Sequence, residues 1–250
     1  IFDFARGGNG AFGGSGGADT PQLFYTRRIG LDNGGVVPIN VGGRLTGKLG
    51  KYAVGLMNIG TSGDAAFKAE PTNFTVVRVK RDVLQRSSIG AMITNRSVAA
   101  SGSGSNAVYG LDGAFLLSQA LTAGAYWAQS QTTGVTGRDQ SYQGRLDYSV
   151  DNFGAKAEFL AVGRNFDPQV GFRRRSDINR SFGEVRFSPR PASQAVVRKF
   201  TGTASGEYVE NGLGIVETRV WRGHFDTEFA NSDVVGLDVS RNYEFLRQPF

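Results

Sequence analysis

The segment YQGRLDYSVDNFGAKAEFLAVG, residues 142–163, alternates apolar and polar residues on both sides of Asp151-Asn152. Successive side chains of a β-strand point to opposite faces, so this alternation predicts two strands, each with one apolar and one polar face. Asp and Asn both tolerate turn conformations, which suits a two-residue connection between the strands. The segment therefore predicts an antiparallel hairpin.

The register that this turn imposes places polar residues opposite polar residues and apolar residues opposite apolar residues. On the polar face Asp147 falls opposite Lys156, and Arg145 falls opposite Glu158. Opposite charges directly across an antiparallel pair contribute roughly 0.2–1 kcal/mol each. The apolar face receives three pairs: Val150 with Phe153, Tyr148 with Ala155, and Leu146 with Ala157. Such agreement favours the hairpin over a helix.

The same alternation recurs from Pro38 onward. A turn at Gly50-Lys51 sets Leu49 against Tyr52 and Leu45 against Leu56. Further alternating stretches lie at residues 77–80, 89–93, 108–117, 121–127, 225–229 and 235–239. We count roughly ten strands joined mostly as consecutive hairpins, which predicts an all-β, antiparallel up-and-down arrangement.

Composition excludes several classes of protein. The chain has 250 residues, no Cys and a single His, His224. Without Cys there is no disulfide framework, thiolate zinc site, iron–sulfur cluster or cysteine nucleophile, and one His leaves no paired-imidazole metal site. The mean hydropathy of -0.25 excludes a protein of many membrane-spanning helices. We expect no cofactor and no catalytic residue that the sequence singles out.

Two features could suggest other structures. Residues 113–137 carry no charge over a length that would suffice for a membrane-spanning helix, but Ser, Gln, Thr and Gly interrupt the stretch and favour strands. The net charge of +6 is spread among acidic residues, so no nucleic-acid partner is expected.

The apolar face is better suited to lipid than to a second protein layer. Small residues recur on it, where a β-sandwich core would need more volume: Ala123, Ala125, Gly144, Ala155, Ala157 and Ala161. Tyr109, Tyr142 and Trp127 lie near strand ends, where membrane barrels place aromatic residues. The pattern favours a transmembrane β-barrel with a charge network facing its lumen: Arg44, Lys48, Arg78, Lys80, Arg145, Asp147, Lys156 and Glu158.

The chain divides at about Pro38. Residues 1–37 are rich in Gly and contain FYTRRIG at 24–30, which predicts a linker or loop segment. Residues 38–250 contain the barrel strands. The chain begins with Ile1 and no apolar signal segment follows, so we expect a piece of a longer precursor whose targeting signal lies upstream.

Several motifs resemble one known family. They are FYTRRIG (24–30), PINVGGRLTGKLGKYAVGLMN (38–58), TNFTVVRVKRDVL (72–84), SIGAMITNRS (88–97), NAVYGLDGAF (106–115) and NFDPQVGFRRR (165–175). They are similar to the functionally uncharacterised outer-membrane β-barrel domain that usually follows a family-9-like carbohydrate-binding domain in Gram-negative bacteria. Ile1–Phe4 resembles the segment joining the two domains.

The resemblance implies a location in the bacterial outer membrane, with membrane lipid as a partner. It also implies that this chain is a fragment, because family barrels continue further and the carbohydrate-binding domain lies upstream. Carbohydrate would then be bound through that upstream domain. An incomplete barrel would leave two unpaired strand edges in lipid.

Three motifs could support chemistry. Gly42–Lys48 matches the spacing of a phosphate-binding loop, but Leu49 stands where Ser or Thr is required and no helix follows. His224, Asp226 and Glu228 share one strand face, which predicts polar lumen side chains because alternate residues lie about 7 Å apart. Five arginines could bind an anion or anchor a loop through acids such as Asp177: Arg27, Arg28, Arg173, Arg174 and Arg175.

Three functions remain open from the sequence. The first is an outer-membrane barrel acting as a pore, receptor or membrane anchor, linked to carbohydrate binding or uptake. The second is a glycoside-hydrolase-associated domain that uses lumen or loop carboxylates. The third is a soluble β-rich binding module.

Overall fold

The structure is a computed structural model that describes residues 1–5, 19–32, 34–193 and 196–245. Its long strands are β3 (Ile39–Leu49), β4 (Tyr52–Thr61), β5 (Thr72–Leu84), β6 (Ser87–Arg96), β7 (Asn106–Leu116), β8 (Leu121–Thr132), β9 (Gln140–Ser149), β10 (Phe153–Val162), β11 (Ile178–Phe187), β12 (Val197–Asn211), β13 (Val216–Phe229) and β14 (Val234–Glu244). Short elements complete the list: β1 (Leu31–Asp32), β2 (Gly35–Val36) and the 3₁₀ turns η2 (Thr26–Arg28) and η3 (Ala65–Phe67).

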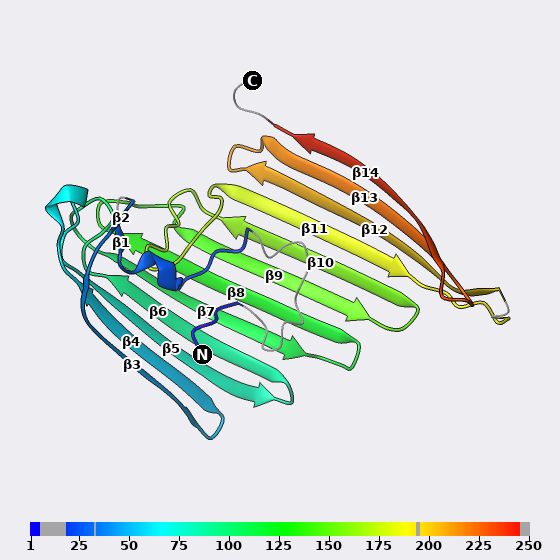
Figure 1. The fold of residues 1–250 in the computed structure, drawn as a ribbon, viewed down its shortest axis with the longest axis horizontal. Helices are drawn as coiled ribbons and strands as arrows, with labels where there is room; N and C mark the ends of the chain where they lie inside the picture. Colours follow the sequence, from blue (N-terminus) through cyan, green and yellow to red (C-terminus); the bar gives the residue numbers. More distant parts are fainter. Residues whose placement is uncertain (6–18, 33, 194–195, 246–250) are drawn as a thin grey trace. The chain divides into compact units, whose positions relative to one another are not determined.

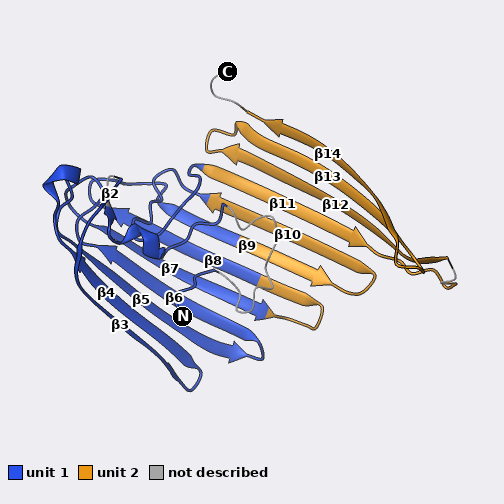
Figure 2. Cartoon of the chain, in the orientation of Figure 1, with its two compact units in different colours: residues 1–115, 124–143, 162–177 blue, residues 116–123, 144–161, 178–250 orange. Residues whose placement is uncertain are grey.

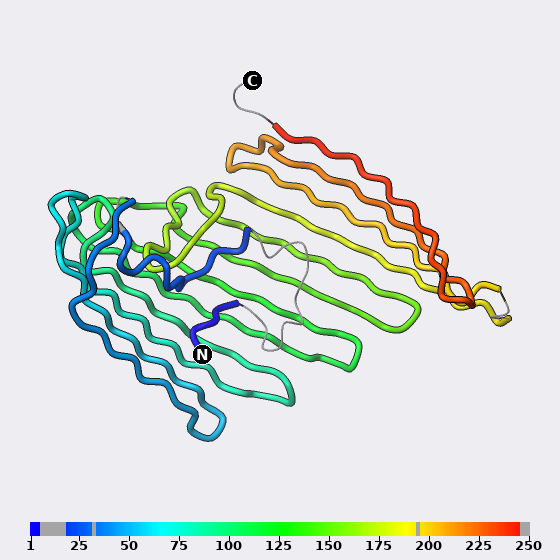
Figure 3. Tube along the Cα trace, viewed as in Figure 1, coloured from blue at the N-terminus to red at the C-terminus, as the bar shows by residue number. Residues whose placement is uncertain are grey.

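The twelve long strands form one antiparallel sheet in which each strand pairs with its neighbours in sequence (Figures 1 and 3). The all-β, up-and-down prediction is therefore confirmed. Hydrogen bonds between described residues do not close the sheet, because β3 and β14 stand at the two ends of the strand order. No helix among the described residues is long and apolar enough to cross a bilayer.

Both predicted hairpins form in the predicted place. Leu45 pairs with Leu56 and Leu49 with Tyr52 across the Gly50-Lys51 turn, where Gly50 has a φ of 56°. In the hairpin of β9 and β10, the amide of Val150 donates to the carbonyl of Phe153 at 2.8 Å. Within residues 113–137, residues 113–116 end β7 and residues 121–132 form β8, and none of them is helical.

The strand count of roughly ten is too low, because the sequence analysis missed β11 and β12. Alternate residues on one face of β11 are Asn179, Ser181 and Gly183, and on the same face of β12 they are Gly202, Ala204 and Gly206. Polar and small residues give little hydrophobic alternation, although the backbone pairs along the full length of both strands.

The chain divides into two compact units (Figure 2). Unit 1 comprises residues 1–115, 124–143 and 162–177, and unit 2 comprises residues 116–123, 144–161 and 178–250. In each unit, cross-strand pairing separates two faces of the strands. We call the face bearing Leu45, Val79 and Leu111 in unit 1, and Val185, Trp221 and Leu237 in unit 2, the apolar face. The polar face bears Arg78 and Asp112 in unit 1, and Arg180, Glu184 and His224 in unit 2.

In unit 1 the polar face is covered by the chain's own segments. Phe4, Leu23, Phe166 and Val170 are buried there, and the ring of Phe4 meets the ring of Tyr126 edge-on at 5.6 Å. Gln22 bridges to Phe172, which joins the early segment to the connection between β10 and β11. The described parts of the predicted 1–37 linker thus pack into unit 1, whereas residues 6–18 lie outside the described chain.

Candidate functional site on the polar face

An arginine–aspartate pair at the centre of unit 1 holds the N-terminus. Arg78, only 1% exposed, donates from Nη2 to Oδ2 of Asp112 at 2.8 Å. The backbone amide of Ala5 donates to the same carboxylate at 3.3 Å, and the guanidinium of Arg78 lies 5.5 Å from the ring centroid of Phe4. Arg78, which the sequence analysis assigned to a charge network, and Asp112, which it did not name, thus contact the chain's own first residues.

Glycines on the polar face make room for this arrangement. A Cβ at Gly110 would lie 2.6 Å from the ring of Phe4 and 2.9 Å from Leu23. A Cβ at Gly90 would lie 2.6 Å from the guanidinium of Arg78. Real side chains do not approach so closely, so a side chain at Gly110 would displace Phe4 and Leu23, and one at Gly90 would displace the guanidinium of Arg78.

Of the five arginines predicted to bind an anion or anchor a loop, three contact loop residues of unit 1. Arg173 Nε lies 3.2 Å from Asp167 Oδ1, and Arg174 Nε lies 3.9 Å from Asp19 Oδ1. Arg28 Nε donates to the carbonyl of Gly171 at 3.2 Å. Arg27 is exposed on η2, and Arg175 is partly buried. Their placement supports the loop-anchoring interpretation.

Asp177, named as an example of an acid for that anchoring, pairs with two other arginines. Arg138 Nη2 lies 2.9 Å from Asp177 Oδ1 in an ion pair, and Arg164 Nη2 donates a hydrogen bond to Asp177 Oδ2 at 3.1 Å. These two arginines come from the connections on either side of β9 and β10, so Asp177 ties those connections together rather than holding Arg173 or Arg174.

In unit 2 a buried arginine joins two carboxylates. Arg180 on β11 donates from Nη1 to Glu158 at 2.6 Å and from Nε to Glu207 at 2.9 Å. Its side chain is 1% exposed. Three neighbouring strands, β10, β11 and β12, are thereby linked across the polar face.

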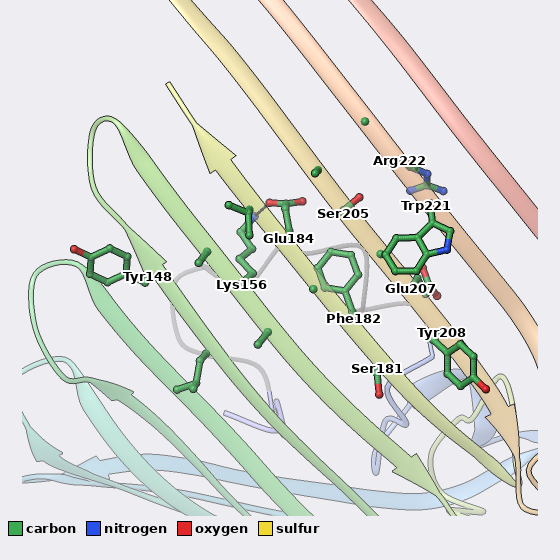
Figure 4. A pocket seen from close by; sticks show the side chains of 18 of the residues that line it. Tyr148, Lys156, Ser181, Phe182, Glu184, Ser205, Glu207, Tyr208, Trp221 and Arg222 are labelled. Atoms are coloured by element: carbon green, nitrogen blue, oxygen red, sulfur yellow. Dashed lines mark hydrogen bonds and ion pairs between the residues drawn. The ribbon is translucent and has the colours of Figure 1, made fainter. Parts of the chain in front are cut away.

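The predicted partners of Lys156 and Glu158 were incomplete. Lys156 Nζ donates to Glu184 of β11 at 2.8 Å (Figure 4), and Glu158 accepts from Arg180. A strand inside a sheet has two neighbours, and the missed strand β11 supplies both of these charges. Arg145 and Asp147 lie on the polar side of β9, partly buried.

The predicted charges in unit 1 other than Arg78 lie nearer solvent. Lys48 Nζ lies 3.4 Å from Asp82, and the two side chains are 65% and 51% exposed. Arg44 is also exposed on β3, whereas Lys80 on β5 is partly buried. Exposed pairs contribute little, because water screens them.

We expect Lys48→Ala to change the free energy of unfolding by less than about 0.5 kcal/mol. The measurement is urea unfolding of the protein folded in detergent micelles. A loss above about 1 kcal/mol would show that Lys48 has a structural role that its exposure does not indicate.

The one histidine is held between two aspartates. His224 Nε2 lies 2.6 Å from Asp226 and Nδ1 lies 2.7 Å from Asp238 of β14. Glu228, the third residue of the predicted polar row, accepts from Arg198 at 3.0 Å instead. In the described part of the chain, no group of three His, Asp or Glu side chains could hold a metal ion.

Two other chemical motifs have structural roles. Gly42–Lys48 lies within the extended strand β3 and forms no phosphate-binding loop. Glu158 and Glu207 both accept hydrogen bonds from Arg180 in a buried ion triad. This arrangement supports a structural role and singles out no catalytic pair.

Sequence analysis missed Asp112, Arg180, Glu184 and Glu207. Asp112 was visible as a polar residue in an alternating stretch, but its partner could not be chosen without the register of β6. Arg180 and Glu184 are four residues apart in INRSFGEVRF, so both would lie on the same face of a strand. This spacing was the only signal in the segment.

Comparisons with protein-family models, with curated proteins and with solved structures returned no match.

Proposed function

We propose that the chain forms the wall of a bacterial outer-membrane β-barrel that serves as a membrane anchor with a self-filled interior. One observation carries the proposal: large apolar side chains stand exposed on one face of the strands, while ion pairs lie on the other. Leu45 is 70% exposed and Leu111 59% exposed in unit 1, as is Leu237 at 65% in unit 2. Hydrocarbon would cover this face without a second protein layer.

The apolar face of unit 1 has the border expected of a membrane-embedded band. Near the connections that follow β4, β6 and β8 it changes from aliphatic to amide side chains. Asn58 donates to Asn73 and to Thr75 at 2.8 Å. Tyr109 and Trp127 lie at this border with ring centroids 5.9 Å apart. Aromatic residues followed by polar residues mark the interface of transmembrane barrels with water.

The polar face of unit 1 is covered by other segments of the chain, which favours a membrane anchor over an open pore. Phe4, Leu23, Phe166 and Val170 occupy the side of unit 1 that would face the lumen. Carbohydrate binding would belong to a domain joined at the N-terminus, as the resemblance implies. Because the first residues are fixed to Arg78 and Asp112, such a domain would be tethered closely to the wall.

The absence of cysteine from the chain makes this proposal testable with single cysteines. Ala204 and Ser205 are neighbours on β12 with opposite faces and similar size. In liposomes, we expect Ser205→Cys to react with a charged, water-soluble thiol reagent at least tenfold faster than Ala204→Cys, because lipid excludes the charged reagent.

Both variants should react equally in urea, which controls for intrinsic reactivity. Equal rates in the folded protein, or a protein that stays monodisperse without detergent or lipid, would contradict the membrane assignment. If only Ala204→Cys were labelled, the apolar face would be the one in contact with water, and the assignment of the two faces would be reversed.

A further inference from the structure

The apolar face of unit 2 contains a hollow of about 980 Å³, shown in Figure 4. Its floor consists of small residues from four neighbouring strands: Ala155, Ala157, Gly183, Ala204 and Gly223. The ring of Trp221 covers Gly206 beside them. Tyr148, Tyr208 and Trp221 stand at its border. If this face is covered by lipid, as proposed above, the hollow is open to acyl chains.

Two arginines lie on this same apolar face beside the hollow. Arg219 pairs across the strands with Tyr243, and Arg241 with Trp221, so the two arginines are diagonal neighbours about 8 Å apart. Both are exposed. Arg241, which also lines the hollow, forms no ion pair with any described residue, and the guanidinium of Arg219 lies 5.7 Å from the ring of Tyr243.

A cation facing lipid needs an anionic partner. A guanidinium in hydrocarbon is costly unless it reaches the headgroup level or a phosphate. Arg219 and Arg241 lie three residues from the ends of β13 and β14, about 10 Å along each strand. This depth, together with the tyrosines and tryptophan around them, places the pair at the membrane interface.

The lengths of the connections indicate which interface this is. Outer-membrane barrels have short periplasmic turns and longer outer loops. One end of the sheet has mostly short connections (50–51, 85–86, 117–120, 150–152 and 230–233), with 188–196 as the exception. At the other end, four of the five connections are longer (62–71, 97–105, 133–139 and 163–177). The fifth, 212–215, has four residues, and the Arg219–Arg241 pair lies beside it.

We propose that this surface binds a phosphorylated, multiply acylated glycolipid of the outer leaflet, of the lipid A type. One phosphate bridges Arg219 and Arg241, since guanidinium groups form charge-assisted hydrogen bonds with phosphate oxygens. An acyl chain lies in the hollow over the small residues. The proposal rests on the membrane assignment and adds the leaflet and the headgroup chemistry.

The test uses native mass spectrometry of the full chain folded in detergent micelles, with bisphosphorylated lipid A as the probe. We expect Arg219→Ala/Arg241→Ala to lower lipid A retention about tenfold or more. Arg81→Ala is the matched control, because Arg81 is exposed on the apolar face and lies over the ring of Tyr52 at the other end of the strands. It should retain lipid A like the parent.

Two further arms separate phosphate from acyl recognition. Lipid A without phosphates should bind the parent as weakly as bisphosphorylated lipid A binds the double variant. Gly223→Leu, at a position where a new side chain meets nothing within 4 Å, should fill the hollow and lower retention severalfold without unfolding the sheet.

Each outcome decides the proposal. Equal retention by the parent and the arginine double variant overturns it, as does equal binding of phosphatidylglycerol and lipid A. In both cases the membrane assignment survives if the Ala204 and Ser205 cysteines behave as expected. If the chain does not insert into liposomes at all, the membrane assignment is wrong, and the lipid A site that depends on it is wrong as well.

Discussion

Replacing Arg180 with Ala should lower the free energy of unfolding by about 3–5 kcal/mol. Removing one partner of a buried ion pair leaves the other charges without compensation. Here two carboxylates, Glu158 at 11% exposure and Glu207 at 20%, would lose the same cation. The measurement is urea unfolding of the protein folded in detergent micelles.

The effect should be specific to the buried triad. Lys156→Ala removes a cation from a pair whose side chains are 39% and 26% exposed, and we expect a loss of about 1 kcal/mol or less. Neutralising the acids in the same protein, as Arg180→Met with Glu158→Gln and Glu207→Gln, should restore most of the lost stability. Equal losses for Arg180→Ala and Lys156→Ala would contradict the assigned role.

Local sequence signals were sufficient where a turn and an alternating pattern coincided. Asp151-Asn152 and Gly50-Lys51 fix both a turn and a register, because side-chain direction has a period of two along a strand. The faces of Leu45, Arg44 and Lys48 followed directly. The same logic placed Arg78 on the polar face before its partner was known.

Long-range partners could not be predicted in the same way. Lys156 can reach a charge on either neighbouring strand, and the choice of Glu184 depends on β11. The apolar side of β11 begins with Asn179, Ser181 and Gly183, so alternation is weak until Val185. The N-terminal segment was equally hidden. Its glycines suggest a linker, but Phe4 is buried because Gly110, more than a hundred residues away, leaves a slot for it.

That slot gives the second large expected effect. Phe4→Ala should weaken docking of the N-terminal segment by about 3–5 kcal/mol, since it removes a buried aromatic ring from contact with Tyr126 and Arg78. Such a loss raises the undocked population about a hundredfold or more. Hydrogen–deuterium exchange of the peptide that contains residues 1–5 would report it.

Gly110→Leu tests the same slot by a change on strand β7 instead of the N-terminal segment, because the new side chain would occupy the place of the Phe4 ring. It should accelerate exchange in residues 1–5 as Phe4→Ala does, while amides of β5 and β6 stay protected. Phe2→Ala is the control: Phe2 is partly exposed and lies 5.4 Å from the ring of Phe24, so its effect should be smaller. If all three variants exchange at the parent's rate, the N-terminus is not held by the slot, and the argument for a filled anchor over an open pore loses its main support.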